Sequence, residues 1–326
     1  MHAAPTARRS PASPCTHSGV LDKFSRHRRY NSPICKALAM DHETVDLAKA
    51  IGRCATTLGV EIDLDAERGP EALLRAAGVC NRRVCPFCEW RRSRAWRRRF
   101  FQGLPEFHSD FPTHKPIFLT LTVKNCRLED LRDTISQMNR SWKRLTMLAL
   151  FPSKFWFRRT EVTLHRSGME IEAGGYMVHP HMHILLMVPA SYFSRDYIRK
   201  TEWQKAWMMS ARLDYAPVVD VRRAKAPSSS GGATIAQSRT AALEASKYAT
   251  KATDLINMGS ALGEYHRQVK GLRLSASSTS FKPYIADSPI DDSELLDKGE
   301  SPAGNYLKGT AVWFDDIGEY LFSDIS

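Results

Sequence analysis

The stretch YMVHPHMHILLMV, residues 176–188, places three histidines at alternate positions of an otherwise apolar run. Side chains two apart on a β-strand share a face, so one face of this run is apolar and the other carries the histidines. Because Pro180 cannot donate to a sheet ladder, we expect regular pairing to begin near His181. The run predicts a strand with a core face formed by Val178, Pro180, Met182, Ile184, Leu186 and Val188.

These histidines are candidate ligands of a divalent metal ion. His181 and His183 would lie about 6–7 Å apart along a strand, close enough for two imidazoles to reach one ion. A single histidine here would favour a hydrogen-bonded core residue, but three in alternation opposite an apolar face indicate a site. His179, at the mouth of the strand, is a further candidate ligand.

Glu161 is the candidate third ligand. It belongs to RRTEVTL, on the strand expected just before the histidine strand. Imidazole and carboxylate together, with open positions, suit Mg²⁺ or Mn²⁺ and would also accept Zn²⁺ or Co²⁺. The alternative is a solvated carboxylate or an ion pair with Arg158 or Arg159.

Strands and helices alternate around the histidine strand. Apolar patterning predicts further strands over 117–123, 155–164 and 216–223, and helices over 128–148, 194–211 and 239–256. This order predicts an α+β fold in which helices pack on a sheet.

The two ends of the chain differ in composition from this central part. Residues 1–40 are rich in Ala, Pro, Ser, Arg and His and are expected to be disordered, whereas weak periodicity predicts helices over 43–60 and 69–78. The tail from residue 280 onward is acidic and is expected to be irregular. We therefore divide the chain into a disordered segment (1–40), a helical and Cys/Arg-rich segment (41–105), a central domain (106–260) and a C-terminal extension (261–326).

Charge and cysteine usage narrow the possible environments. The 326 residues carry a formal net charge of +12, with a pI of about 9.5, which favours polyanionic partners. Seven cysteines, an odd number, do not suit the paired framework of a small secreted protein. The N-terminus lacks the apolar region of a secretory signal peptide. The longest apolar run, 184–190, is far shorter than the ~20 residues of a membrane helix. We expect a soluble, cytoplasmic protein without a membrane partner.

The segment CNRRVCPFCEWRRSRAWRRRFF, residues 80–101, has a different character again. Cys80, Cys85 and Cys88 follow the spacing C-x4-C-x2-C, and with a fourth ligand they would bind a structural Zn²⁺. Three residues are candidates for that ligand: Cys54, His108 and His114. The alternatives are a redox role of CPFC and plain buried cysteines.

Arginines and aromatic residues interleave on the helix expected after these cysteines. Arginines neutralise phosphates, while aromatic side chains stack on unpaired bases or pack inward. Six arginines within nine residues repel one another unless an anion relieves them, so a solvated basic face is the weaker alternative. The segment predicts a DNA-binding surface that contains Arg91, Arg92, Arg94, Arg97, Arg98 and Arg99.

The stretch LEASKYATK, within the helix expected over 239–256, could carry a nucleophile. Glu244, Tyr248 and Lys251 are spaced four and three residues apart, so on a continuous helix they share one stripe. A tyrosine, with an ordinary pKa near 10, needs a nearby cation, base or metal to attack phosphorus near neutral pH. Lys247 and Lys251 could hold a phosphodiester and Glu244 could act as base; the alternative is an ordinary helix with Glu–Lys pairs.

Taken together, IFLTLTV (117–123), HPHMH (179–183) and EASKYATK (244–251) resemble, in order and spacing, the three motifs of the plasmid rolling-circle replication initiators of the HUH endonuclease superfamily. The cysteine–arginine segment is similar to the one that precedes the first motif in that family. The resemblance covers roughly residues 75–260. It implies a small antiparallel sheet flanked by helices, with the metal site on its open face.

The resemblance also implies a mechanism and partners. His181 and His183 would hold a divalent cation, and Tyr248 would attack the scissile phosphate of single-stranded plasmid origin DNA. A 5′-phosphotyrosine link and a free 3′-OH primer would result, and Glu244 would activate water in the terminating step. A host helicase and DNA polymerase are expected partners, and a homodimer is one expected assembly. Glu161 and His179 both stay candidates, because the motif does not settle the third ligand.

Two other functions are compatible with parts of the sequence. A histidine-triad nucleotide hydrolase would use His181 or His183 for direct attack but leaves the arginine segment and the tyrosine helix unexplained. A non-catalytic, zinc-containing nucleic-acid-binding protein explains the charge and makes Tyr248 incidental. Tyr192 and Tyr197 lie outside the motif and are candidates for any second nucleophile.

Overall fold

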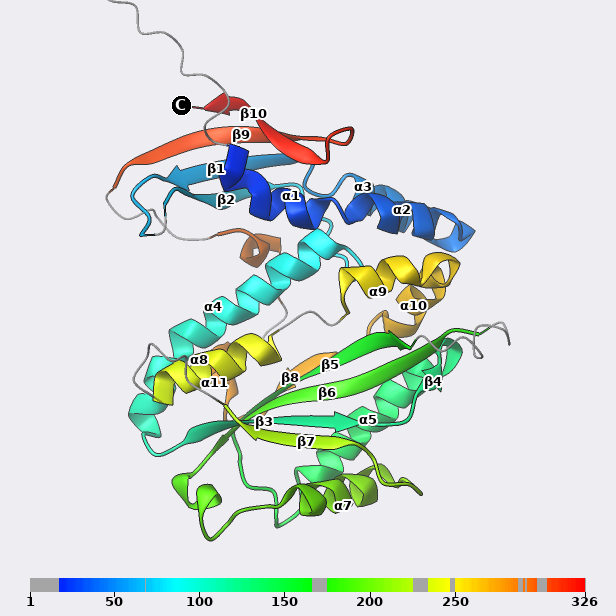
Figure 1. Ribbon diagram of the computed structural model, residues 1–326, viewed down its shortest axis with the longest axis vertical. Helices are drawn as coiled ribbons and strands as arrows, with labels where there is room; N and C mark the ends of the chain where they lie inside the picture. The colour runs from blue at the N-terminus through cyan, green and yellow to red at the C-terminus, as the bar shows by residue number, and fades with distance from the viewer. Residues whose placement is uncertain are drawn as a thin grey trace, which may run out of the picture.

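The computed structural model describes residues 18–67, 69–165, 175–224, 234–246, 250–286, 290, 292–297 and 304–325. The chain forms two antiparallel sheets, and the long helix α4 (Pro86–Asp110) runs from one to the other (Figure 1). The smaller sheet has the strand order β10-β9-β1-β2, and the larger has the order β7-β3-β6-β5-β8 with β4 also paired to β6. In the part of the chain that is described, none of the helices combines the length and apolar character that crossing a bilayer requires.

The larger sheet is built around the histidine strand β6 (Met177–Val188). β3 (Lys115–Thr122) and β5 (Trp156–His165) flank it, and β7 (Val219–Arg223) and β8 (Ser275–Ser277) form the edges. All of these pairings are antiparallel. The expected α+β fold, with helices flanking an antiparallel sheet, is confirmed.

Pro180 marks a change of partner along β6. On one side, pairing with β3 begins at His181, as expected from the proline, and β4 (Cys126–Arg127) pairs again from Val178. On the other side, pairing with β5 continues without a break to Met177. The proline therefore lies at the gap between β3 and β4, and β5 keeps the whole strand in place.

The two faces of the larger sheet carry different helices. The apolar side chains of β6 pack under α5 (Leu131–Leu145) and α7 (Lys200–Ala211). On the opposite face, Leu185 and Met187 pack under α4, α8 (Thr234–Ala245) and α11 (Lys282–Ile285). His181 and His183 belong to this second face, because they lie at odd positions of the same strand. Only part of the second face is thus filled by apolar side chains.

The N-terminal region differs from its sequence-based expectation. Residues 22–52, of which 22–40 were expected to be disordered, contain α1 (Asp22–Arg28), α2 (Asn31–Ala39) and α3 (Val45–Gly52). The helix expected over 69–78 is wrong, because β2 (Glu71–Ala77) pairs with β1 (Thr57–Asp63). Ala72 and Leu74 alternate inward in this strand. Pairing and burial therefore outweigh the helix propensity of EALLRAA.

The C-terminal tail is also more regular than expected. β9 (Tyr306–Phe314) pairs with β1, and β10 (Glu319–Ile325) pairs with β9. β1, the partner of β9, lies about 250 residues earlier in the chain, so no local sequence pattern could predict this pairing. The domain boundaries at residues 40, 105 and 260 stay predictions.

The helix expected over 239–256 is interrupted. α8 ends at Ala245 and α9 begins at Ala252 (Ala252–Asn257). The Oγ of Ser93 donates to the carbonyl oxygen of Ser246 (2.7 Å), so this carbonyl is satisfied by a side chain of α4 rather than by a further turn of helix. Lys251 has extended backbone (φ −69°, ψ 142°). The expectation of one continuous helix was therefore wrong.

The remaining elements join the two sheets or shape turns. α10 (Leu262–Val269) contacts α2 of the N-terminal region and α5 of the larger sheet, and α9 contacts α2 and β5. Short 3₁₀ turns are η1 (Ser18–Leu21), η2 (His42–Thr44), η3 (Leu128–Asp130), η4 (Ala190–Phe193), η6 (Gly259–Ala261) and η7 (Asp292–Leu295).

Candidate functional site

Strand register brings the candidate metal ligands together on the second face of the larger sheet. Glu161 of β5 lies directly opposite His181 of β6. His183 lies two residues further along β6, and residues two apart on a strand share a face. The strand pair β5–β6 therefore brings three candidate ligands together.

The three side chains converge closely. The Nε2 atoms of His183 and His181 lie 3.0 and 3.5 Å from the Oε2 atom of Glu161. One ligand atom from each residue falls within 4.8 Å of the others. Burial alone would raise the pKa of Glu161, but hydrogen bonds and charge from the two histidines lower this pKa to about 2. The carboxylate is therefore charged at neutral pH, as a metal ligand must be.

Hydrogen bonds behind the ligands orient both imidazole rings. The Nδ1 of His181 lies 3.2 Å from the carbonyl oxygen of His179, which can only accept a hydrogen bond. When Nδ1 donates to this carbonyl, deprotonation of Nε2, which faces Glu161, would leave Nε2 as the nitrogen that can bind a metal ion. The Nδ1 of His183 lies 3.3 Å from the Oγ1 of Thr120 on β3. Both rings thus turn Nε2 toward Glu161.

His179, the further candidate, lies outside this ligand set. Its Nδ1 is 2.9 Å from the Oδ1 of Asn125, and its ring stacks on that of His181 with centroids 5.3 Å apart. Among the described residues, the group with metal-ligand proximity is Glu161, His181 and His183. His179 therefore supports the neighbouring ring rather than converging with it.

α8 covers the same face of the sheet as the ligands. Its residues Ala241, Ala242 and Ala245 pack with Leu185 and Met187 of β6. Glu244 lies one residue before the end of this helix and is half-buried. The chain leaving α8 therefore starts on the histidine face.

The single stripe expected for Glu244, Tyr248 and Lys251 is not formed by a continuous helix. Lys251 is exposed and lies outside α8, at the residue before α9. Tyr248 and Lys247 lie outside the described residues. Their flanks are held by side chains: Ser246 by the Ser93 contact, and Thr250 by a 2.6 Å hydrogen bond between its Oγ1 and the hydroxyl of Tyr265.

Among the described residues, the contacts of the two tyrosines considered as a second nucleophile are not with the candidate metal ligands. Tyr192 is 1% exposed, and its hydroxyl accepts a hydrogen bond from the indole nitrogen of Trp203 (3.1 Å). Tyr197 is exposed and its ring packs against that of Tyr192. Trp203 belongs to α7, on the opposite face of the sheet.

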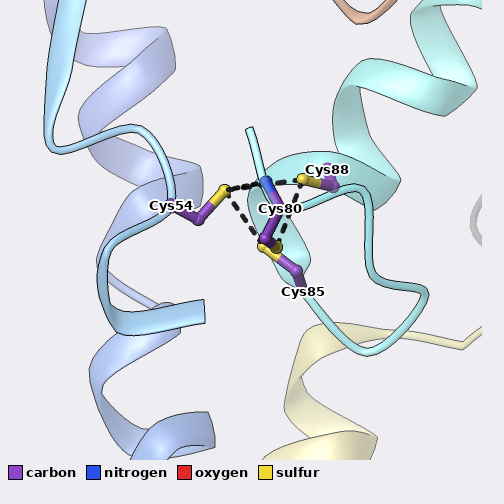
Figure 2. A group of neighbouring side chains, drawn as sticks. All are labelled: Cys54, Cys80, Cys85 and Cys88. Carbon is purple, nitrogen blue, oxygen red and sulfur yellow. Dashed lines mark hydrogen bonds between the residues drawn. The ribbon is translucent and has the colours of Figure 1, made fainter. Parts of the chain in front are cut away.

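A second candidate metal group lies at the beginning of α4. Figure 2 shows four cysteines pointing toward one another, three from the segment that enters α4 and one from the turn after α3. The sulfurs of Cys54 and Cys88 are 3.5 Å apart, and those of Cys80–Cys88 and Cys85–Cys54 are each 3.7 Å apart. The group is Cys54, Cys80, Cys85 and Cys88.

The structure thus selects Cys54 among the three candidates for the fourth ligand. His108 instead has its Nε2 2.8 Å from the Oγ of Ser238, and His114 packs among aromatic rings that include Phe107. Hydrogen bonds from the other three thiols lower the pKa of Cys80. The hydrogen bond with Cys80 raises the pKa of Cys54, and burial raises the pKa of Cys85, so thiolate, the form that binds metal, is favoured at Cys80 alone of these three.

The arginine surface expected along α4 is only partly present. Arg91 and Arg92 are buried; Arg91 pairs with Asp297 (2.9 Å) and Arg92 with Glu89. Arg99 pairs with Glu294 (2.6 Å), and Arg98 donates to backbone carbonyls of the same segment. Of the expected set, Arg97 is exposed, and Arg94 is half-buried with its guanidinium 5.7 Å from the centroid of the Trp90 ring. The expectation of a surface contact was wrong for Arg91, which Asp297 of a distant segment neutralises inside the fold; Arg92 is 8% exposed and pairs with Glu89 three residues earlier.

Thr120, Asn125 and Glu89 are site residues that the sequence patterns missed. Thr120 and Asn125 support histidines from β3 and the turn after it, and Glu89 pairs with Arg159 of β5 (3.0 Å). Each contact spans more than 50 residues of chain. Thr120 does lie in the motif-like strand 117–123, which is the one local signal that pointed to it.

Comparison with known proteins identifies relatives of the chain. The Rep_1 family model, described as "Replication protein", matches residues 71–313. The chain is 33% identical over 217 residues to a "Protein rep" of Streptococcus pneumoniae serotype 2, covering 63% of this chain and 65% of that protein. It is 34% identical over 182 residues to a "Protein rep" of Lentilactobacillus hilgardii, covering 54% of each. A "Protein rep" of Bacillus amyloliquefaciens is 33% identical over 220 residues, covering 64% of this chain and 61% of that protein.

The matched region thus spans between about half and two thirds of the length of these relatives. No solved structure matches the chain significantly.

Proposed function

The chain belongs to the replication protein family whose model matches residues 71–313, and on this premise we propose that it is a plasmid replication initiator that nicks single-stranded origin DNA. One observation carries the proposal. Glu161, His181 and His183 form a metal-ligand group on the sheet face that α8 covers, and the chain that leaves α8 leads into Tyr248 within three residues.

The ligand group fits a hard divalent cation. Two imidazole nitrogens and one carboxylate oxygen converge within 4.8 Å, and three protein ligands leave positions open for phosphate oxygens. This donor set suits Mg²⁺ or Mn²⁺, and we propose one of these as the ion. When bound, the cation would polarise the non-bridging oxygens of the scissile phosphate.

The chemistry proposed for the protein residues is a transesterification. The phenolic oxygen of Tyr248 forms a new bond to phosphorus, and the bond from phosphorus to the 3′-oxygen breaks. The phenolic proton passes to a base, for which Glu244 is our candidate, and the leaving 3′-oxygen takes up a proton. The products are a 5′-phosphotyrosine link and a free 3′-OH, which can prime DNA synthesis. Lys247 and Lys251 are proposed to hold the phosphodiester beside Tyr248.

The four-cysteine group fits a structural zinc ion. Four thiolates at about 2.3 Å from one zinc in a tetrahedron lie about 3.8 Å apart. The observed sulfur separations of 3.5 and 3.7 Å approach this value and are far longer than the ~2.0 Å of a disulfide bond. With four protein ligands the site is closed, so we propose a structural rather than a catalytic zinc.

The proposed partners follow from the proposed reaction. Plasmid origin DNA, single-stranded at the nick, is the substrate, and the surface arginines Arg94 and Arg97 are candidate contacts to it. Strand displacement from the 3′-OH requires a helicase and a DNA polymerase of the host cell. A homodimer remains a proposal.

The test is covalent adduct formation on single-stranded DNA. Purified protein with Mn²⁺ and labelled oligonucleotides tiled across its replicon should give a protein–DNA band on a denaturing gel. Tyr248→Phe should abolish the band, while the matched control Tyr197→Phe, at an exposed tyrosine, should retain it. Tight DNA binding with no adduct on any tile would instead support the non-catalytic nucleic-acid-binding protein.

A further inference from the structure

A basic cavity lies beside the candidate metal ligands. It has a volume of about 580 Å³ and lies between the start of α4, β5 and the segment around β8. Five of its lining side chains are cationic: Arg83, Arg92, Arg159, Arg273 and Lys282. In the described part of the chain no carboxylate lines it. Behind this lining, Glu89 pairs with Arg92 and Arg159.

Arg159 is built into the wall of this cavity without a full set of partners. Its side chain is 4% exposed, and its Nη2 donates to Glu89. Within the described residues, its Nε and Nη1 atoms are buried and have no hydrogen-bond acceptor. Buried guanidinium N–H groups without acceptors are costly, so an acceptor that enters the cavity would remove that cost.

The cavity and the metal ligands share one face of the sheet. Arg159 and Glu161 are two residues apart on β5, so both point to the histidine face, about 7 Å from each other along the strand. Arg159 also lies directly opposite His183 in the β5–β6 register, and Ser275 of the cavity pairs with it from β8. A chain of phosphates that crosses the metal ligands toward β8 would therefore enter the cavity next.

We propose that this cavity binds the backbone phosphates of single-stranded DNA adjacent to the scissile phosphate. Arg159 and Arg92 form its buried floor, and Arg83, Arg273 and Lys282 surround its mouth. Guanidinium groups bind phosphate oxygens through paired, charge-assisted hydrogen bonds. The inference rests on the proposed nicking function, since it assigns that reaction a subsite that sets the position of the DNA strand over the metal ligands.

The test is the salt dependence of DNA binding. Binding of a fluorescent 30-nucleotide single strand is measured by anisotropy at several KCl concentrations, without added divalent cation. The variant carries Arg83→Gln, Arg273→Gln and Lys282→Gln. Arg159 is left intact, because without it the buried carboxylate of Glu89 would lose one of its two cationic partners. The control carries Arg195→Gln, Lys200→Gln and Lys205→Gln, which remove the same charge on and before α7, on the opposite face of the sheet.

The cavity variant should bind about tenfold more weakly at low salt. Each lost phosphate contact should also lower the salt slope of the logarithm of affinity by ~0.7. The control should keep a slope close to that of the wild-type protein. Equal slopes and affinities for the cavity variant and the control would overturn the proposal.

The adduct assay of the same proteins separates this proposal from the proposed function. If the wild-type protein forms adducts while the slopes of both variants are equal, the nickase stands and the cavity proposal fails. If the wild-type protein forms no adduct, and the salt dependence of DNA affinity is reduced in the cavity variant but not in the control, the cavity is a phosphate site and the nicking function fails.

Discussion

Thr120 is the residue that fixes how His183 presents its ligating nitrogen. Its Oγ1 lies 3.3 Å from the Nδ1 of His183, and it stands opposite this histidine in the β3–β6 register. Second contacts of this kind set the tautomer and the orientation of a ligating imidazole. If the group binds a metal ion as proposed, its metal affinity should therefore depend on a residue that does not touch the metal.

We expect Thr120→Val to weaken Mn²⁺ binding by about 10-fold, the lower end of the usual effect of such a contact. Valine has nearly the same shape but offers no hydrogen-bonding group. Titration calorimetry with Mn²⁺ measures the change. Thr122→Val is the matched control, because Thr122 lies on the same strand and donates to the carbonyl of Val218 instead. Equal Mn²⁺ affinities of the two variants would argue against an orienting role of Thr120.

At the scale of elements, α1 is held on α4 by a neutral histidine. The ring of His27 stacks on that of Trp90 with centroids 4.4 Å apart and an interplanar angle of 15°. Burial, together with the charges of Arg26 and Arg94, lowers the pKa of His27 to about 4. In the unfolded chain this pKa is about 6.5.

Between pH 6.5 and 4 the unfolded chain therefore binds a proton at His27 that the folded chain does not bind, so stability falls as the pH falls. We expect this residue to account for at most about 2 kcal/mol of the loss at pH 5. His27→Phe keeps an aromatic ring on Trp90 and takes up no proton. Urea unfolding at pH 7 and pH 5 should thus show a smaller acid loss for the variant, and an identical loss in both proteins would count against the assignment.

The contact between α4 and α11 depends on a glycine. A Cβ added at Gly103 would lie 1.4 Å from the carbonyl oxygen of Tyr284. Replacing a helical glycine with alanine usually stabilises a protein by up to about 1 kcal/mol, but here backbone would have to move.

We expect Gly103→Ala to destabilise the protein by about 3 kcal/mol, the upper part of the range for overpacking. Thermal unfolding measures the effect. Gly78→Ala is the control, because nothing lies within 4 Å of a Cβ at that position. A Gly103→Ala protein as stable as the wild type would show that α11 can shift at little cost.

At the scale of the whole molecule, the four-cysteine group joins regions that are distant in the sequence. Cys54 follows α3, Cys80 follows β2, and the other two cysteines begin α4. α4 then crosses to the larger sheet, where Trp96 and Phe100 pack against Phe157. A zinc ion held there would link the small sheet to the histidine face through one rigid helix.

We expect Cys54→Ser to reduce the bound zinc to well below one ion per chain and to lower the temperature of unfolding. Elemental analysis after dialysis and a thermal scan measure the two effects. Cys35→Ser is the matched control, since Cys35 is a free thiol whose Sγ contacts the carbonyl of Ala48, and serine can make the same contact. Zinc retained in full by Cys54→Ser would rule out Cys54 as a ligand.

The accuracy of the sequence-based predictions follows the range of the interactions involved. The alternation in residues 176–188 predicted both the apolar face of β6 and the convergence of His181 and His183, because a strand has a period of two wherever it lies. The helix expected over 69–78 failed because the partner of β2 lies on β1 and outweighs local propensity. Beyond α8, the carbonyl oxygen of Ser246 accepts a hydrogen bond from Ser93, about 150 residues away, which no local pattern indicates.

The sequence by itself determined the histidine strand, its two faces, three of the four clustered cysteines and the basic character of the chain. These properties depend on local periodicity, residue chemistry and total charge. Only the tertiary structure decided that Cys54 is the fourth sulfur, that Glu161 rather than His179 meets the two histidines, and that Arg91 and Arg92 lie inside the fold. Each of these outcomes is set by the position of residues far apart in the chain, which strand register and helix packing fix and which no local pattern encodes.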